Sequence, residues 1–223
     1  MRKIGMVVAV EDKALRQKYG EGYDLQDGRG TLLYQTKQSQ VYALHSGPGE
    51  ILAAAATQYL IDRYEVATIL NYGVVGACTE AMKAGETCVV SKVVHHQYDI
   101  SAVDNVPVGR YLEYPSVWLP VSEMLLEKAI AARPDLKCVI CASGDKFVDN
   151  PDEKIRLHKE FGADICDMEA AAILLTCDLN RVPCLIVKTV SDGVRGGASE
   201  YWAEKDRTAT SCLDIVGQII DEL

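Results

Sequence analysis

Cys166-Asp-Met-Glu-Ala-Ala-Ala172 and Val187-Lys-Thr-Val-Ser-Asp-Gly193 are the two stretches that decide how this chain folds. In the first, a short apolar run passes into an alanine-rich helical pattern at Glu169. In the second, Asp192 ends an apolar strand directly before a glycine. Two carboxylates at the ends of neighbouring strand units predict a site above one edge of a sheet.

Strand and helix patterns alternate along nearly the whole chain. The apolar run 4–10 predicts a buried first strand, and residues 67–72 predict a strand that ends in the glycine-containing stretch 73–76. Alternation of this kind favours an α/β fold with a mixed, largely parallel central sheet surrounded by helices. We expect a single domain over residues 1–223. Further strands are expected at 32–35, 40–45, 87–94, 136–142, 163–166 and 183–190, and helices at 11–19, 51–63, 121–132, 152–161, 169–180 and 201–223.

The composition excludes several classes of protein. The 223 residues are 48% hydrophobic and 25% charged, which is enough material for a buried core. The net charge is −9 and no long Lys or Arg run occurs, so we expect no nucleic-acid partner. No apolar stretch reaches membrane-spanning length and no signal peptide is evident, so we expect no membrane partner and a cytoplasmic location.

The chain contains eight cysteines, most of them among apolar residues. In a reducing compartment we expect buried thiols without disulfides. Cys138 and Cys141 have metal-ligand spacing, but no second pair of Cys or His residues accompanies them at zinc spacing. No metal site is therefore expected.

Each candidate residue also has a purely structural interpretation. Glu169 suits the first turn of a helix, where a negative charge meets the helix dipole favourably. Asp192 suits a cap of the turn at Gly193. Phe147, in Ser143-Gly-Asp-Lys-Phe-Val148, is either a core residue or a platform on which a ring stacks. Single residues do not decide between these alternatives.

Two glycine-containing stretches are weak candidates for ligand contacts. In Asn71-Tyr-Gly-Val-Val-Gly76, Gly73 and Gly76 allow backbone amides to approach a phosphate or a ribose. Ser46-Gly-Pro-Gly49 opens a helical pattern, where an anion would be favoured. These features gain weight because they fall at the ends of successive strands.

In combination and in order, the motifs resemble the nucleoside phosphorylase and nucleosidase superfamily, and within it the methylthioadenosine/S-adenosylhomocysteine nucleosidases. The resemblance runs over nearly the whole chain. It implies cleavage of the N-glycosidic bond of a purine nucleoside by a homodimer, with no organic cofactor and no metal. The motifs that carry it are Lys3-Ile-Gly, Ser46-Gly-Pro-Gly49, Asn71-Tyr-Gly-Val-Val-Gly76, the segment 84–91, Ser143-Gly-Asp-Lys-Phe-Val148, Asp167-Met-Glu-Ala170 and Val190-Ser-Asp192.

The resemblance implies that two residue pairs hold the nucleoside. Met168 and Glu169 cradle the ribose, whose hydroxyls donate to the carboxylate. Ser191 and Asp192 contact the imidazole edge of the purine, where the acid protonates or hydrogen-bonds N7. A general acid at N7 makes the base a better leaving group, and a carboxylate at the ribose favours an oxocarbenium-like centre. We expect partial burial to raise the pKa of Asp192.

The remaining substrate contacts are implied by position in the same way. Phe147 stacks on the base, and the backbone of Val148 binds its Watson–Crick edge. Ile100 and Val103 match residues that complete the neighbouring subunit's apolar pocket for the 5′ group. The aromatic residues that match the closing position after the loop 193–199 are Tyr201 and Trp202. For both of these pairs, the alternative is ordinary packing in an interface or in the core.

The side that handles the nucleophile departs from the family pattern. Lys13 stands where the hydrolases carry the glutamate that orders the attacking water. Glu11 and Asp12 precede it, and they are either its replacement or a solvated pair at a helix start. Val74 replaces a hydroxyl residue of the family, and Lys188 replaces an arginine, keeping the charge but not the bidentate fork.

Our first hypothesis is therefore attack by water. A phosphate-dependent purine nucleoside phosphorylase is the alternative, suggested by the local string around Arg16, although Asn71 and Val74 occupy the places of phosphate-gripping residues. A nucleoside-binding homologue without turnover is a third hypothesis, suggested by Lys13.

Overall fold

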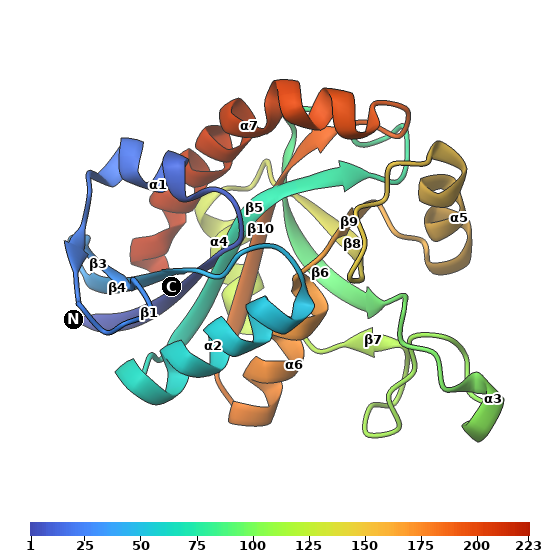
Figure 1. Ribbon diagram of the computed structural model, residues 1–223, viewed down its shortest axis with the longest axis horizontal. Helices are drawn as coiled ribbons and strands as arrows, with labels where there is room; N and C mark the ends of the chain where they lie inside the picture. The colour runs from blue at the N-terminus through green and yellow to red at the C-terminus, as the bar shows by residue number, and fades with distance from the viewer.

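A curved ten-stranded sheet lies between two groups of helices (Figure 1). The computed structural model describes residues 1–223. Helices α1 (Asp12–Tyr19) and α7 (Gly197–Ile219) pack against each other on one side of the sheet. Helices α2 (Glu50–Tyr64) and α6 (Ala170–Asn180) pack together on the other. The α/β class with a central mixed sheet, predicted from the alternation of patterns, is confirmed.

The strand order is β10-β6-β8-β9-β5-β1-β4-β3-β2, with β7 paired to β6. Strand β10 also pairs with β5, so the strands from β10 to β5 form a closed ring. The long ladders β1–β4, β5–β10 and β6–β8 are parallel, whereas β10–β6 and β5–β9 are antiparallel. The strands are β1 Arg2–Val8, β2 Tyr23–Asp24, β3 Leu32–Gln35, β4 Ser39–His45, β5 Thr68–Ala77, β6 Thr87–His95, β7 Trp118–Leu119, β8 Lys137–Ser143, β9 Ile165–Asp167 and β10 Cys184–Asp192.

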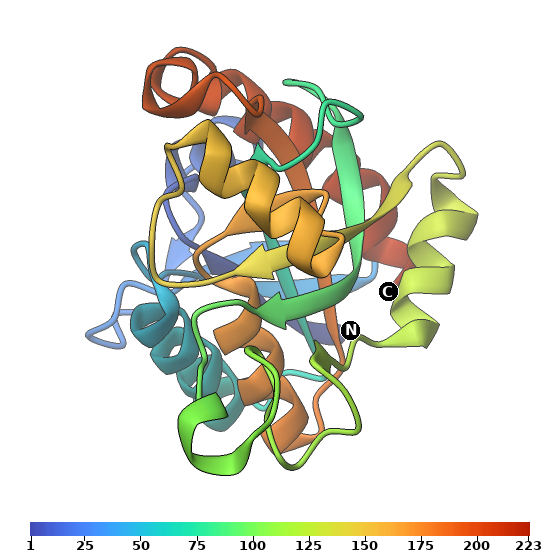
Figure 2. The ribbon, with the colours of Figure 1, turned by 90° about the vertical axis from the view of Figure 1, so that its right-hand side faces the viewer.

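The remaining helices lie apart from these two pairs. Figure 2 shows α5 (Pro151–Phe161) lying across the strands and α3 (Ser101–Asp104) in a loop that projects from the body. The Asn150 side chain accepts hydrogen bonds from two amides of the first turn of α5, which is the usual role of an asparagine at an N-cap. Helix α4 spans Glu123–Ala132, and a short 3₁₀ helix at Ile220–Glu222 follows α7. Among the helices, none combines the length and the apolar character of a bilayer-crossing segment.

Side chains alternate between two buried clusters, one on each face of the sheet. In β1, Ile4, Met6 and Val8 pack beneath α7, whereas Val7 packs on the side of α2 and α6. A strand that is covered on both faces needs apolar residues at successive positions, which is why residues 4–8 form an unbroken apolar run apart from Gly5. Each fully buried Ile or Leu side chain stabilises such a core by about 1.5–3 kcal/mol.

Two strands and one helix extend further than the sequence patterns predict. Strand β5 continues through the stretch 73–76 to Ala77, because this stretch pairs with β10 on one side and β9 on the other. The expected glycine loop is therefore strand. Strand β10 continues to Asp192, and α7 begins at Gly197 rather than residue 201, which shortens the loop between them. The Glu200 carboxylate holds this loop by accepting the amide of Gly193 at 2.8 Å.

Candidate active site

The carboxyl ends of β1, β5, β8, β9 and β10 open on one pocket, which is lined by 17 residues. The ring of strands explains the convergence, because it brings the ends of strands far apart in sequence to one place. Nine of the predicted site residues line this pocket: Glu11, Val74, Phe147, Val148, Met168, Glu169, Ser191, Asp192 and Tyr201.

Glu169 occupies the N-cap position of α6, but its side chain caps nothing in that helix. Its carboxylate instead accepts a hydrogen bond of 3.0 Å from the backbone amide of Gly49, at the start of α2. The turn 46–49 was expected to bind an anion. In the structure, the amide of Gly49 in this turn donates to the carboxylate of Glu169. Glu169 does stand at the N-terminus of α6, where a negative charge meets the helix dipole favourably, but its hydrogen bond goes to α2 and not to its own helix.

Buried charges surround Glu169. Lys188 lies beneath the pocket, almost fully buried, with its ammonium nitrogen 3.0 Å from an oxygen of Asp167. Burial raises the pKa of Glu169 to about 7, with Lys188 opposing the rise and Asp167 adding to it. Burial also works against the Lys188 ammonium, but the neighbouring carboxylates of Asp167, Glu169 and Glu11 raise its pKa above the usual value. Lys188 is therefore a fixed positive charge, and Glu169 ionises near neutral pH.

This pKa predicts how stability depends on pH. A carboxyl group whose pKa is higher in the folded than in the unfolded state stabilises the fold at low pH and loses that contribution as pH rises through the folded value. Between pH 4.5 and about 7 the loss is roughly 3 kcal/mol. We therefore expect Glu169→Gln, which cannot ionise, to gain stability relative to the unchanged protein as pH rises. Thermal melting at pH 5 and pH 8 measures the difference, and an equal difference at both pH values would contradict it.

Glu11 follows β1 and is the charged residue of that segment that lines the pocket. Its carboxylate accepts hydrogen bonds of 2.9 Å from the amides of Val10 and Val74. A Cβ atom at Gly73 would lie 2.8 Å from one of its oxygens, so only glycine leaves room for this carboxylate. The Tyr72 hydroxyl donates to the Glu11 carbonyl at 2.8 Å and fixes the backbone. Two amides thus hold the Glu11 carboxylate at the pocket, and Tyr72 holds its backbone.

The two residues after Glu11 lie elsewhere. Asp12 is in the first turn of α1, outside the pocket. Lys13 is exposed and forms an ion pair with Asp206 of α7. Lys13, which stands at the position expected for the glutamate, therefore faces solvent. Glu11 is the residue whose carboxylate reaches the pocket.

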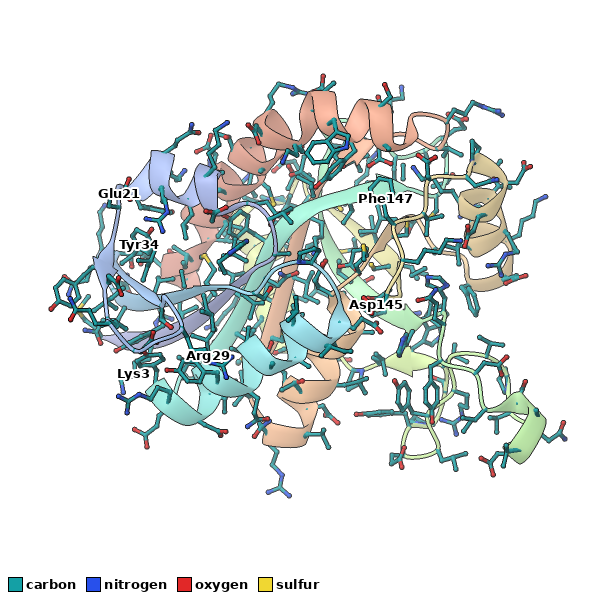
Figure 3. The ribbon with its side chains drawn as sticks, viewed as in Figure 1. Lys3, Glu21, Arg29, Tyr34, Asp145 and Phe147 are labelled. Carbon is teal, nitrogen blue, oxygen red and sulfur yellow. The ribbon has the colours of Figure 1, made fainter.

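Aromatic residues form the outer wall of the pocket. The Phe147 and Tyr201 rings lie 5.3 Å apart in an edge-to-face arrangement, and Phe147 remains 39% exposed. Figure 3 shows Phe147 below α7 and Asp145 beside the start of α2. Asp145 accepts the amide of Glu50 at 3.2 Å, which joins the loop before Phe147 to that helix. A flat ring entering the pocket would meet one face of this wall.

Five predicted site residues lie outside the pocket as this single chain forms it, besides Asp12. Gly73 lies behind Glu11, and Lys188 lies beneath the floor. Trp202 is exposed and packs against Tyr201 from outside. Ile100 and Val103 lie at α3 in the projecting loop and do not line this pocket.

Lys154 was not among the predicted site residues, although it is fully buried in α5 and paired with Asp192. A charged helix was expected at 152–161, with no site role for this lysine. A signal was present, because Lys154 precedes the buried Leu157 by three positions and therefore lies on the same helical face. Asp145 was also missed, because its partner is a backbone amide 95 residues away.

The fold and the site define an α/β protein that binds a small molecule between carboxylates at the ends of its strands. Residues 3–223 match the family model of the phosphorylase superfamily, and the chain belongs to this superfamily.

Individual relatives agree with this assignment. The chain is 26% identical over 198 residues to the 5'-methylthioadenosine/S-adenosylhomocysteine nucleosidase of Shewanella denitrificans, covering 85% of this chain and 86% of the relative. It is 28% identical over 160 residues to the aminodeoxyfutalosine nucleosidase of Campylobacter jejuni, covering 70% and 69%. The crystal structure of futalosine hydrolase from Helicobacter pylori superposes with a TM-score of 0.92 at 25% identity, covering 100% of this chain and 98% of the other.

Proposed function

We propose that this protein is a purine nucleosidase, which cleaves the N-glycosidic bond of a methylthioadenosine-like nucleoside with water. The observation that carries the proposal is the convergence of Asp192, Glu169 and Glu11 on one pocket. Relatives over most of the chain length carry the names of nucleosidases, which supports the same activity.

The three carboxyl groups divide the reaction between them. Asp192 is almost fully buried, and burial raises the pKa of its carboxyl group, which suits a proton donor to purine N7. Glu169, on the other side, accepts hydrogen bonds from the ribose hydroxyls and faces the positive charge that develops on the sugar. Glu11 takes a proton from the attacking water, whose oxygen bonds to C1′ as the bond from C1′ to N9 breaks.

Two walls of the pocket suit the rest of the nucleoside. Phe147 and Val148 flank the position of the base, and Met168 that of the ribose. Val10, Pro48 and Tyr201 add apolar lining to the pocket, which suits a 5′-alkylthio group.

Water, rather than phosphate, suits the nucleophile side. No arginine lines the pocket, and Lys146 is its only basic lining residue. Arg16 lies outside and is paired with Glu21. A phosphate dianion beside Glu11 would meet a carboxylate of like charge.

The assay is release of free adenine from methylthioadenosine, followed chromatographically with and without phosphate. We expect equal rates in both. Strict dependence on phosphate would establish a phosphorylase instead. Tight binding of nucleosides without base release, over a panel of purine nucleosides, would establish a binding protein.

We also propose one domain over residues 1–223 that works as a cytoplasmic homodimer. Large apolar side chains of α2, α3 and α6 remain exposed, among them Ile51, Val103 and Leu179, and pairing of two chains would cover them. Such pairing would also carry Ile100 and Val103 to a neighbouring pocket. The eight free cysteines suit a reducing compartment. A monomeric mass in light scattering would contradict the dimer.

A further inference from the structure

A fully buried lysine lies directly behind the base-facing acid. Lys154, in the first turn of α5, forms an ion pair with Oδ2 of Asp192, and neither side chain is exposed by more than 1%. Its ammonium group also donates to the carbonyl of Gly193 at 3.0 Å. The Ser191 hydroxyl donates to Oδ1 of Asp192 at 2.8 Å. Both carboxyl oxygens are thus held, and the carboxyl group cannot rotate freely.

The position of this lysine is unfavourable for stability alone. Removing an ammonium group from water costs several kcal/mol, which a single ion pair offsets only with good geometry. A cation in the first turn of a helix also meets the positive end of the helix dipole. Well-packed apolar residues often replace such buried pairs without loss of stability. A role in the site therefore accounts for Lys154 better than a role in the core.

Lys154 also joins three elements that surround the base. Helix α5 begins directly after the segment that contains Phe147 and Val148. Asp192 ends β10, and Gly193 begins the loop that leads to α7. The packing is close, since a Cβ atom at Gly76 would lie 3.1 Å from Oδ2 of Asp192 and 3.3 Å from the lysine nitrogen. A movement of α5 would consequently move the acid.

We propose that Lys154 is the positioning residue of Asp192, and that it fixes the carboxyl group against the base while tying it to the loop after β10. This inference rests on the proposed nucleosidase function. Lys154 does not line the pocket, so it acts through Asp192 and not by touching the nucleoside.

The groups around Asp192 predict in which direction its pKa changes when Lys154 is removed. Burial raises the pKa of Asp192, and the hydrogen bond and positive charge of Lys154 oppose the rise, as does the Ser191 hydroxyl. Glu200 of α7 raises it further. The Cys166 thiol of β9 lies on the remaining side, next to Gly76. Without Lys154 the carboxyl group would keep its proton to higher pH.

The test is Lys154→Met, which keeps the length of the side chain and removes the charge. We expect kcat for adenine release to fall by about 10-fold or more with little change in KM, because an interaction needed for bond cleavage is lost. The ratio of kcat/KM in the variant to that of the unchanged enzyme should rise with pH between 5 and 9, because the variant's acid stays protonated longer. Lys159→Met, an exposed lysine of the same helix, is the matched control and should change neither quantity.

A double variant separates positioning from folding. If Lys154 acts through Asp192, adding Lys154→Met to Asp192→Asn should cost far less than it does in the unchanged enzyme. Full additivity, or a loss in the single variant that is the same at every pH, would overturn the inference. If Lys154→Met melts below the assay temperature, Lys154→Gln keeps a donor without the charge and should show the same rise of the ratio with pH. Absence of adenine release by the unchanged enzyme would instead refute the proposed function.

Discussion

Asp192→Asn should reduce kcat for adenine release by about 10²- to 10⁴-fold, the usual contribution of a positioned general acid. The amide keeps the shape of the side chain and its contact with Ser191, but it has no proton to give to N7. Nucleoside binding should persist, because the base still meets Phe147 and Val148 and the ribose still meets Glu169. Single-turnover kinetics with methylthioadenosine measure the bond-cleaving step directly.

Asp152→Asn is the control for this experiment. Asp152 is an exposed carboxylate in the first turn of α5, close in sequence to the site but outside the pocket. It should release adenine at the normal rate. Near-full turnover by a folded Asp192→Asn variant would show that the acid is not Asp192.

Glu11→Gln should lower kcat by about 10²-fold or more, whereas Lys13→Ala should leave it nearly unchanged. Glu11 lies at the pocket, and its carboxylate is the group there that can accept a proton from water beside the ribose. Lys13 is exposed and loses only a surface ion pair with Asp206, which is worth about 0–1 kcal/mol. Steady-state adenine release with both variants tests the two positions side by side.

The two variants distinguish the structural assignment from alignment with the family, because the two predict opposite effects at residues 11 and 13. If alignment with the hydrolase branch alone decided the role, residue 13 would matter and residue 11 would not. Because Gln at position 11 turns one N–H group toward the amides of Val10 and Val74, Glu11→Asp should be measured as well. Normal turnover by both Glu11 variants would show that Glu11 is not the base that takes the proton from water.

Much of this architecture could be predicted from the sequence, because strands covered on both faces carry unbroken apolar runs. The acids at 169 and 192 were also predictable, since each stands where an apolar run ends. The sequence did not show, however, whether Glu169 is a site residue or only a residue that caps a helix. That distinction depends on Gly49, whose amide reaches Glu169 across 120 residues of chain.

The partly wrong expectations concern contacts that no local pattern encodes. The stretch 73–76 looked like a glycine loop, but its partners β9 and β10 lie about a hundred residues later and make it strand. Glu11 and Asp12 have the same chemistry, and only the path of the chain after β1 decides which reaches the pocket. The spacing of Lys154 from Leu157 indicates a shared helical face, but no local pattern shows that Asp192 lies beside the lysine.

The closed ring of strands also constrains the order in which the protein matures. Strand β10, at residues 184–192, inserts between β5 and β6, of which even the later one ends at His95. Pairings so distant in sequence slow folding, because the entropy cost of closing a long loop comes before the contacts that stabilise it can form. A nascent chain that still lacks this strand has neither the closed ring nor Asp192, so ligand capture belongs to the final stage of biogenesis.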